Sequence, residues 1–348
     1  MIDKNMPRTS PELIFKLREG SFADDLFITA VSHFDFFNFL KKDPSDFDNI
    51  AKSLNIKKRP LDVMLTLFKA YGFIMEKNNK YYLSDVSDNY LNSQSPFDLS
   101  SFVSSLKNNP VCSEMKKVLI TGKPANWAAS KKGKRWATSM ESDDFAQSFT
   151  AGMISRGVYL AKGLLSAIDL RKFRKLLDIG GASGIYSITL LSDNPGLNGA
   201  IFEKPPVDKM ARYTINKSGL NDRMKVIPGD MFKDKFPGGY DVHFISHVLH
   251  DWDFKEMKFI LKNSFDNLEP GGMVIIHDAH INDTKTGPVS VAEYSVLLMF
   301  FSEGKCYSTS EIKQILEETG FRDIRYRPTI LNRSIITGIK PDEIIINQ

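Results

Sequence analysis

From Phe173 onward, short apolar runs rich in branched residues alternate with stretches that have the spacing of helices. The runs lie at 175–179, 200–202, 224–227, 240–245 and 273–277. Strands that alternate with helices pair in parallel, and the helices then cover both faces of the sheet. This pattern predicts a Rossmann-like α/β domain over residues 171–348.

The first run leads into a turn rich in glycine, which extends from Asp178 to Gly184 and also contains Gly180 and Gly181. Glycine lets the backbone approach a ligand closely. The glycines do not have the GxGxxG spacing, which counts against a dinucleotide with a pyrophosphate. The turn alone is a weak signal, and its meaning depends on the strands that follow.

Two further strand ends favour a nucleoside site. Glu203 ends the second run, about 25 residues after Asp178, where a carboxylate can bind both ribose hydroxyls. After the third run, Asp230, Met231 and Phe232 offer an acid and two large side chains to the amine and ring of an adenine. Taken singly, Asp230 is also typical of a solvated turn, and Phe232 is also typical of the core. Their order after successive strands nevertheless predicts one nucleoside site.

His250 lies in the loop after the run 240–245, where open α/β sheets hold their active-site residues. An imidazole with a pKa of about 6.5 can remove the proton of a hydroxyl acceptor near neutral pH. A packed or capping histidine is the alternative. Asp278 and four more histidines crowd the same segments, and together they raise the alternative of a divalent metal site: His243, His247, His277 and His280.

The N-terminal part, residues 1–110, has the apolar spacing of short amphipathic helices. Helices over 46–54 and 59–68, followed by a hairpin over 72–83, predict a winged helix-turn-helix. Acidic and basic residues balance there, which favours a dimerisation module over DNA binding. The helices of 11–90 carry more apolar surface than a small domain can bury, so we expect an intertwined homodimer.

Residues 111–170 predict a helical connector that contains Trp127, Trp136, Phe149 and Met153. Its apolar face either packs against the catalytic domain or forms a wall of a substrate pocket, because aromatic and methionine side chains give an adaptable apolar lining. Further candidates for that pocket are Leu297, Met299 and Phe301.

Composition limits the partners and the location. The net charge of +4 over 348 residues is small and spread along the chain, so nucleic acid is not an expected partner. The two cysteines lie far apart and outside any CxxC pattern, which fits a reducing cytoplasm. Neither a secretion signal nor an apolar stretch of about 18 residues is present, so we expect no membrane association.

Five segments taken together resemble the S-adenosylmethionine-dependent small-molecule O-methyltransferases, a family that includes plant caffeate, vertebrate hydroxyindole and bacterial antibiotic enzymes. They lie, in the family's order, at 177–184, 202–207, 229–232, 247–253 and 268–272. The resemblance extends over nearly the whole chain. It implies S-adenosylmethionine as cofactor, with Ser246 among the residues that bind it, a small-molecule methyl acceptor and no metal.

The resemblance also assigns His250 as general base and Asp278 as the first of two acids that hold its imidazole. Where the family has its second acid, this chain has Cys306, and Glu303 lies nearby. This departure keeps open a thiol or an activated carbon as the methyl acceptor. A DNA-binding regulator with a sensor domain is the alternative of another class. The identity of the acceptor is not written in the sequence.

Overall fold

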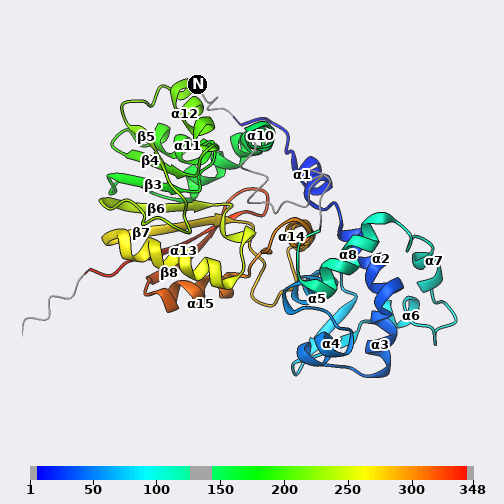
Figure 1. The fold of residues 1–348 in the computed structure, drawn as a ribbon. Helices are drawn as coiled ribbons and strands as arrows, with labels where there is room; N and C mark the ends of the chain where they lie inside the picture. Colours follow the sequence, from blue (N-terminus) through cyan, green and yellow to red (C-terminus); the bar gives the residue numbers. More distant parts are fainter. Residues whose placement is uncertain (1–5, 126–142, 343–348) are drawn as a thin grey trace, which may run out of the picture. The chain divides into compact units, whose positions relative to one another are not determined.

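The computed structural model describes residues 6–125 and 143–342, and the chain divides into two compact units (Figure 1). The first unit comprises residues 1–10, 134–280 and 309–348, and the second comprises 11–133 and 281–308. Each unit has its own core and is described by itself. Within the described residues, no helix is long and apolar enough to cross a bilayer.

The first unit is built on a seven-stranded sheet with the order β5-β4-β3-β6-β7-β9-β8. Pairing is parallel from β5 through to β7, which confirms the predicted α/β fold. The central strands are buried along nearly their whole length, as parallel strands covered on both faces must be. The strands are β3 (Lys175–Ile179), β4 (Asn198–Glu203), β5 (Met224–Pro228), β6 (Tyr240–Ser246), β7 (Leu268–Asp278), β8 (Arg322–Pro328) and β9 (Ser334–Ile339).

Helices of the first unit connect these strands and fall into two packed groups. The first group is α10 (Asp143–Ala167), α11 (Ile185–Asp193) and α12 (Asp208–Ser218), and the second is α13 (Phe254–Asn267) and α15 (Thr309–Thr319). The chain order reverses between β3 and β6, which are neighbours in the sheet. In folds of this kind the ligand lies at the carboxyl ends of the strands beside such a reversal.

The sheet departs from the predicted parallel arrangement at one edge. Strand β9 runs antiparallel to both β7 and β8. Residues 329–333, which join β8 to β9, are too few for the crossover that a parallel pair requires, so the two strands form a hairpin. The sequence pattern did not reveal this hairpin, because β8 is exposed along most of its length and carries no apolar run.

The second unit is mostly helical and contains a small antiparallel hairpin. Asp46 caps α4 by accepting a hydrogen bond from the Asn49 amide, and the hairpin turns at Asn78 and Asn79, both with positive φ. The core of this unit contains Phe36, Phe37 and Phe68. The elements are α1 (Glu12–Glu19), α2 (Ala23–Phe34), α3 (Phe36–Lys42), α4 (Phe47–Ser53), α5 (Lys58–Ala70), β1 (Ile74–Lys77), β2 (Lys80–Leu83), α6 (Asp85–Tyr90), α7 (Ser100–Ser104) and α8 (Pro110–Thr121).

A late segment of the chain, residues 281–308, belongs to the second unit and contains α14 (Val289–Phe301). Residues 291–300 of this helix are buried on every side, so several helices must cover it. Helix α14 packs on α5, and the Asp62 carboxylate binds the ammonium groups of Lys285 and Lys305. The segment is therefore held by both apolar packing and ion pairs.

Two glycines with the same φ allow a test of how tightly the turn after β3 is built. Gly184 and Gly219 both have φ of +72°, but a Cβ on Gly184 would lie 2.2 Å from Cδ1 of the fully buried Ile201, whereas Gly219 faces open space. Gly219→Ala should lower the free energy of unfolding by about 1–2 kcal/mol. Gly184→Ala should lose about 1–3 kcal/mol more through overpacking. Urea denaturation without ligand measures both, and equal losses would contradict this account.

Candidate active site

The glycine-rich turn joins β3 to α11 at the carboxyl edge of the sheet. Gly180 and Gly184 have positive φ, and the Gly180 amide donates to the Phe202 carbonyl at the end of β4. A Cβ on Gly181 would lie 2.3 Å from the Asp178 carboxylate. The turn is thus folded tightly against two strand ends, and its backbone is free of side chains at these positions.

Two buried carboxylates flank this turn. Glu203 accepts hydrogen bonds from the Ala182 and Lys204 amides, both at 2.8 Å, and burial raises its pKa to about 7. Asp178 accepts from the Ser187 hydroxyl, and burial raises its pKa to about 7 as well. Oδ1 of Asp178 has no hydrogen-bond partner among the described residues. A ligand with hydroxyl or ammonium donors would satisfy such an oxygen.

The third strand end carries the predicted adenine loop. Oδ1 of Asp230 accepts from the Phe232 amide at 3.0 Å, and Oδ2 lies 3.4 Å from the ammonium of Lys233. The Phe232 ring packs edge-on against Trp252, with ring centroids 4.5 Å apart. Asp230, Met231 and Phe232 are all half-buried, so this loop keeps surface available for a ligand.

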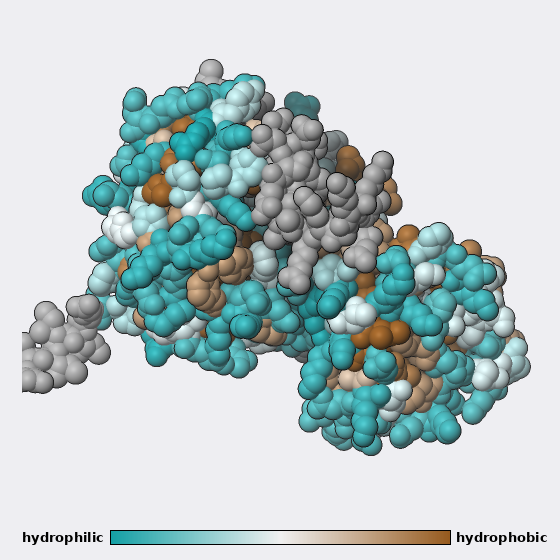
Figure 2. Space-filling model, viewed as in Figure 1, coloured by the Kyte–Doolittle hydropathy of each residue, from teal (hydrophilic) through white to brown (hydrophobic). Residues whose placement is uncertain are grey.

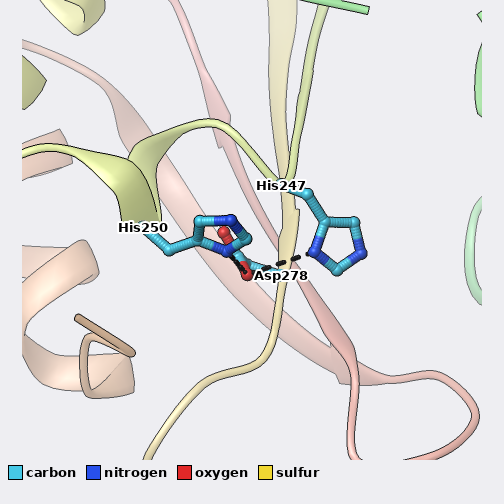
Figure 3. Close-up of side chains that lie close together, drawn as sticks. All are labelled: His247, His250 and Asp278. Carbon is cyan, nitrogen blue, oxygen red and sulfur yellow. Dashed lines mark hydrogen bonds and ion pairs between the residues drawn. The ribbon is translucent and has the colours of Figure 1, made fainter. Parts of the chain in front are cut away.

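His250 and Asp278 form a buried pair at the ends of two neighbouring strands. His250 lies in a short 3-10 turn (η1, Leu249–Asp251) after β6, and Asp278 ends β7. Nδ1 of His250 donates to Oδ1 of Asp278 at 2.6 Å (Figure 3), and the Ala279 amide donates to the same oxygen at 2.8 Å. The sequence predicted both residues, and parallel pairing of β6 with β7 brings them together.

Burial and neighbouring charges act in opposite directions on the pKa values of His250 and Asp278. Burial works to lower the pKa of His250, but the carboxylates of Asp278 and Asp251 outweigh it and raise the pKa above its usual value. Burial works to raise the pKa of Asp278, and His250 and His247 outweigh it, so the pKa lies well below its usual value. Asp278 therefore stays ionised, and His250 binds a proton more readily than an isolated imidazole.

Three of the four histidines of the metal alternative each form a hydrogen bond with a different serine. His243 in β6 bonds to Ser264, His277 to Ser246, and His280 to Ser334. Burial lowers the pKa of His243 and of His277 to about 3. Within the described residues, one group brings three potential ligand atoms within 4.8 Å of one another, and it consists of His247, His250 and Asp278.

The other predicted site residues are divided between the units. In the first unit, Ser246 is bonded to His277 and Met153 is half-buried. Trp127, Trp136 and the side chain of Phe149 lie outside the described residues. The second unit carries the rest: Leu297, Met299, Phe301 and Cys306.

On α14, Leu297 and Phe301 are four residues apart and share one face, whereas Met299 is fully buried on the opposite face. The buried Cys306 donates its amide hydrogen to the Ser295 hydroxyl at 3.0 Å. Glu303, the nearest acid in sequence, is exposed.

Residues 113–322 match the O-methyltransferase domain family. The chain belongs to this family. It is similar to 3-hydroxy-5-methyl-1-naphthoate 3-O-methyltransferase of Streptomyces sahachiroi, with 27% identity over 90% of both chains. L-tyrosine C(3)-methyltransferase of Streptomyces lavendulae is 34% identical over 59% of this chain and 56% of its own length.

A solved structure of an O-methyltransferase family 2 protein from Planctomyces limnophilus DSM 3776, in complex with apigenin, has the same fold. Its TM-score is 0.88 with 27% identity, covering 97% of this chain and 98% of that one. These comparisons confirm the predicted family, the α/β fold and the S-adenosylmethionine-dependent methyl transfer to a small molecule.

The residues of the O-methyltransferase fit its methyl donor. The glycine turn leaves its backbone open, Asp178 offers a buried oxygen without a partner among the described groups, and Glu203 lies at the neighbouring strand end. A nucleoside with an amino-acid tail carries hydroxyl and ammonium donors that suit two buried carboxylates.

Sequence reasoning did not single out two residues that act on His250 or lie near it, Tyr186 and Arg156. Tyr186 is buried in the first turn of α11, two residues after Gly184. The charge of Arg156 on α10 acts on Tyr186, His247 and His250. A guanidinium within an apolar helical stretch was the available signal for Arg156. For Tyr186 the signal was its place directly after the glycine turn.

Removing the charge of Asp278 should lower the pKa of His250. In Asp278→Asn the pKa of His250 should fall, because burial is then opposed by the Asp251 carboxylate but no longer by Asp278. In the wild type, the folded protein gains stability as the pH drops, because the pKa of His250 is raised in the folded state. In the variant, the lowered pKa of His250 makes the folded protein lose stability as the pH drops. The gap in unfolding free energy should therefore widen from pH 8 to pH 6.

Imidazole resonances followed by NMR through pH 5–9 measure the change directly. Resonances of His33, which lies in the second unit, should be unaffected by the substitution. An unchanged His250 titration in the variant would mean that Asp278 does not control this imidazole.

Proposed function

We propose that this enzyme methylates a hydroxyl group of a small, partly apolar acceptor and that His250 is the general base. The hydrogen bond from His250 Nδ1 to the ionised Asp278 carries this proposal. That bond holds the tautomer in which Nε2 is the basic nitrogen. A base held in this way by a buried carboxylate suits proton removal from a hydroxyl.

S-adenosylmethionine supplies a methyl group already activated by a sulfonium. As the methyl–sulfur bond breaks and the methyl–oxygen bond forms, the acceptor's proton passes to Nε2 of His250. Asp278 stabilises the resulting imidazolium, because the two charges lie in contact and away from water. The imidazolium then returns its proton to solvent. The chain's main task is alignment, since the leaving group needs no protonation.

We propose the following residues for the methyl donor. Glu203 binds the ribose hydroxyls, and Asp178, Gly180, Gly181 and Gly184 form the turn against which the donor lies. For the adenine, Asp230 takes the amine, while Met231 and Phe232 contact the ring. Ser246 contributes a hydroxyl at the end of β6. The burial of Glu203 and Asp178, and the half-exposed loop at 230–232, support these roles.

The proposed acceptor is a hydroxylated aromatic compound. The similar Streptomyces enzyme is named for a hydroxynaphthoate, and the similar structure contains apigenin. The apolar candidates Met153, Leu297 and Phe301 suit such a molecule, and we place Phe149, Met299 and Cys306 with them as in the sequence prediction. Turnover of S-adenosylmethionine with a panel of aromatic hydroxyl, thiol and carbon acceptors tests this class directly.

We further propose that the helices and hairpin of the second unit form a winged-helix module for homodimerisation. Hydrophobic areas interrupt the otherwise hydrophilic surface (Figure 2). Exposed apolar side chains lie on α1 and around α7, and several are more than half exposed: Leu13, Ile14, Leu17, Phe97, Phe102 and Leu106. The buried thiols of Cys112 and Cys306 suit the proposed cytoplasmic location.

His250→Ala should lower the transfer rate by roughly 100-fold or more while the affinity for S-adenosylmethionine stays the same, because the base acts only on the acceptor. Stopped-time turnover assays and calorimetry separate the two effects. His33→Gln, in the second unit, is the control and should keep the wild-type rate. A His250→Ala enzyme as fast as the parent would mean that the acceptor arrives already ionised.

Substitutions at Cys306 test whether the absence of the acid that the family has at this position affects the rate of methyl transfer. With a hydroxyl acceptor, Cys306→Glu should retain or raise the rate by stabilising the imidazolium. With a thiolate or carboxylated acceptor, the new charge should raise KM by repulsion. Cys306→Ser keeps the size and removes the sulfur. A rate lost in the serine variant would show that the thiol takes part in the reaction.

Light scattering at micromolar concentration should give twice the mass of the chain. Leu17→Lys combined with Phe102→Lys should shift the protein toward the monomer, because each substitution places a charge in an apolar interface. Tyr326→Lys, on the similarly exposed edge strand β8, is the control and should remain dimeric. A monomeric wild-type protein would contradict the proposed assembly.

A further inference from the structure

Helix α14 of the second unit carries one acid, Glu293, in an otherwise apolar sequence. Oε1 of its carboxylate accepts a hydrogen bond from the Tyr71 hydroxyl at 2.9 Å. Oε2 is buried and has no hydrogen-bond partner among the described residues. Native interiors rarely leave a carboxylate oxygen unsatisfied, and such an atom points to a bound group that supplies the donor.

Glu293 lies on the least covered side of its helix. Glu293, Leu297 and Phe301 follow one another at intervals of four residues and therefore share one face. Helices α1, α2, α5 and α8 pack on α14, and Val296 and Met299 are fully buried. By contrast, Glu293 is 8% and Leu297 9% exposed, and Phe301 is half-buried. The carboxylate thus belongs to the face on which we place the acceptor.

The surroundings of Oε2 are negative. A Cβ on Gly20, at the end of α1, would lie 3.2 Å from Oε2 and 2.8 Å from the Lys16 carbonyl oxygen. The Gly20 amide is already bonded to that carbonyl at 2.8 Å, so it does not serve the carboxylate. The carbonyl end of a helix also carries partial negative charge. A buried carboxylate in such a place is stabilised most by a cation.

The Tyr71 hydroxyl reports the same negative environment. Burial, followed by the carboxylates of Glu293 and Asp24, raises the pKa of Tyr71, so this hydroxyl keeps its proton and donates it to Oε1. The hydroxyl satisfies one oxygen and leaves the negative charge of the carboxylate without a counter-charge from this side chain.

Aromatic rings lie beside the same face. Phe22 stacks on Phe300, with ring centroids 4.6 Å apart, and packs edge-on against Phe301 at 5.1 Å. Its φ of +93° is rare for a residue with a side chain, and such a conformation is typical of a functional position. Aromatic rings together with one placed charge suit a ligand that has an apolar body and a cationic end.

We propose that Glu293 is a specificity-determining residue that binds an ammonium group of the acceptor through Oε2. An ammonium supplies both the N–H donor and the positive charge that this oxygen lacks. The proposal deepens the proposed function and rests on it in one respect, because the ligand is the acceptor of the same methyl transfer. The acceptor then differs in charge from the hydroxynaphthoate for which the similar Streptomyces enzyme is named.

Four phenols of nearly the same size test this proposal. Tyramine, tyrosol, 4-propylphenol and 4-hydroxyphenylacetate end in an ammonium, a hydroxyl, a methyl and a carboxylate group. Calorimetry at neutral pH on the intact enzyme, saturated with S-adenosylhomocysteine, measures their dissociation constants. The wild type should bind tyramine about tenfold more tightly than 4-propylphenol, and 4-hydroxyphenylacetate most weakly. A preference for tyrosol over tyramine would overturn the ammonium assignment.

Two variants separate ligand binding from a structural role. Glu293→Gln keeps the shape and an acceptor for Tyr71 but removes the charge, so tyramine and 4-propylphenol should bind within about twofold of each other. Tyr71→Phe keeps the carboxylate and removes its hydroxyl partner, so the preference for tyramine should persist. If Glu293 served only to hold Tyr71, the two variants would change the preference alike.

The matched control is Glu114→Gln. Glu114 is a surface acid on α8 that pairs with Lys117, so this variant loses the same charge within the second unit and should keep the wild-type preference. Urea midpoints of all variants show whether a change of affinity comes from a loss of folding.

Equal affinities of the wild type for tyramine and 4-propylphenol, absence of binding included, would overturn the role of Glu293. An unchanged preference in Glu293→Gln would do the same. These binding measurements need no turnover, whereas the proposed general-base function is read from turnover by His250→Ala, so either proposal can fail alone.

Discussion

Parallel pairing of β6 with β7 is the constraint on which the His250–Asp278 pair depends. Ser246 lies opposite His277 in this register, so the loop that carries His250 starts beside the strand end that carries Asp278. A slip of one residue would turn Asp278 to the other face of the sheet, since side chains alternate along a strand. The 2.6 Å bond between the two residues therefore rests on the core packing that fixes this register.

Burial acts on every ionisable group near this edge, and its effect differs with the partner. It lowers the pKa of His243, His247, His277 and His280, which keeps these rings neutral. At His250 the buried Asp278 reverses the sign, because an ion pair away from water is strong enough to outweigh desolvation. The result is a single basic imidazole among several neutral ones.

The two units draw on distant parts of the chain. Helix α14 is apolar around its whole circumference, so it cannot lie on a surface and is covered by the N-terminal helices. Arg59 on α5 donates to the Gly304 carbonyl, and Asp62 binds Lys285 and Lys305. Consequently Leu297 and Phe301 belong to the same unit as the N-terminal helices that cover α14.

The sequence by itself predicted the parallel strands, the glycine turn and the positions of His250 and Asp278, because these depend on local periodicity and on the rule that strand ends carry the active site. It also placed Glu203 and Asp230 at successive strand ends. The β8–β9 hairpin escaped it, since an exposed edge strand has no apolar pattern. Only the tertiary structure decided that the rings of Tyr186, His247 and His277 pack against one another. Such contacts join residues from different elements, and no spacing along the chain encodes the burial or the charge that they meet there.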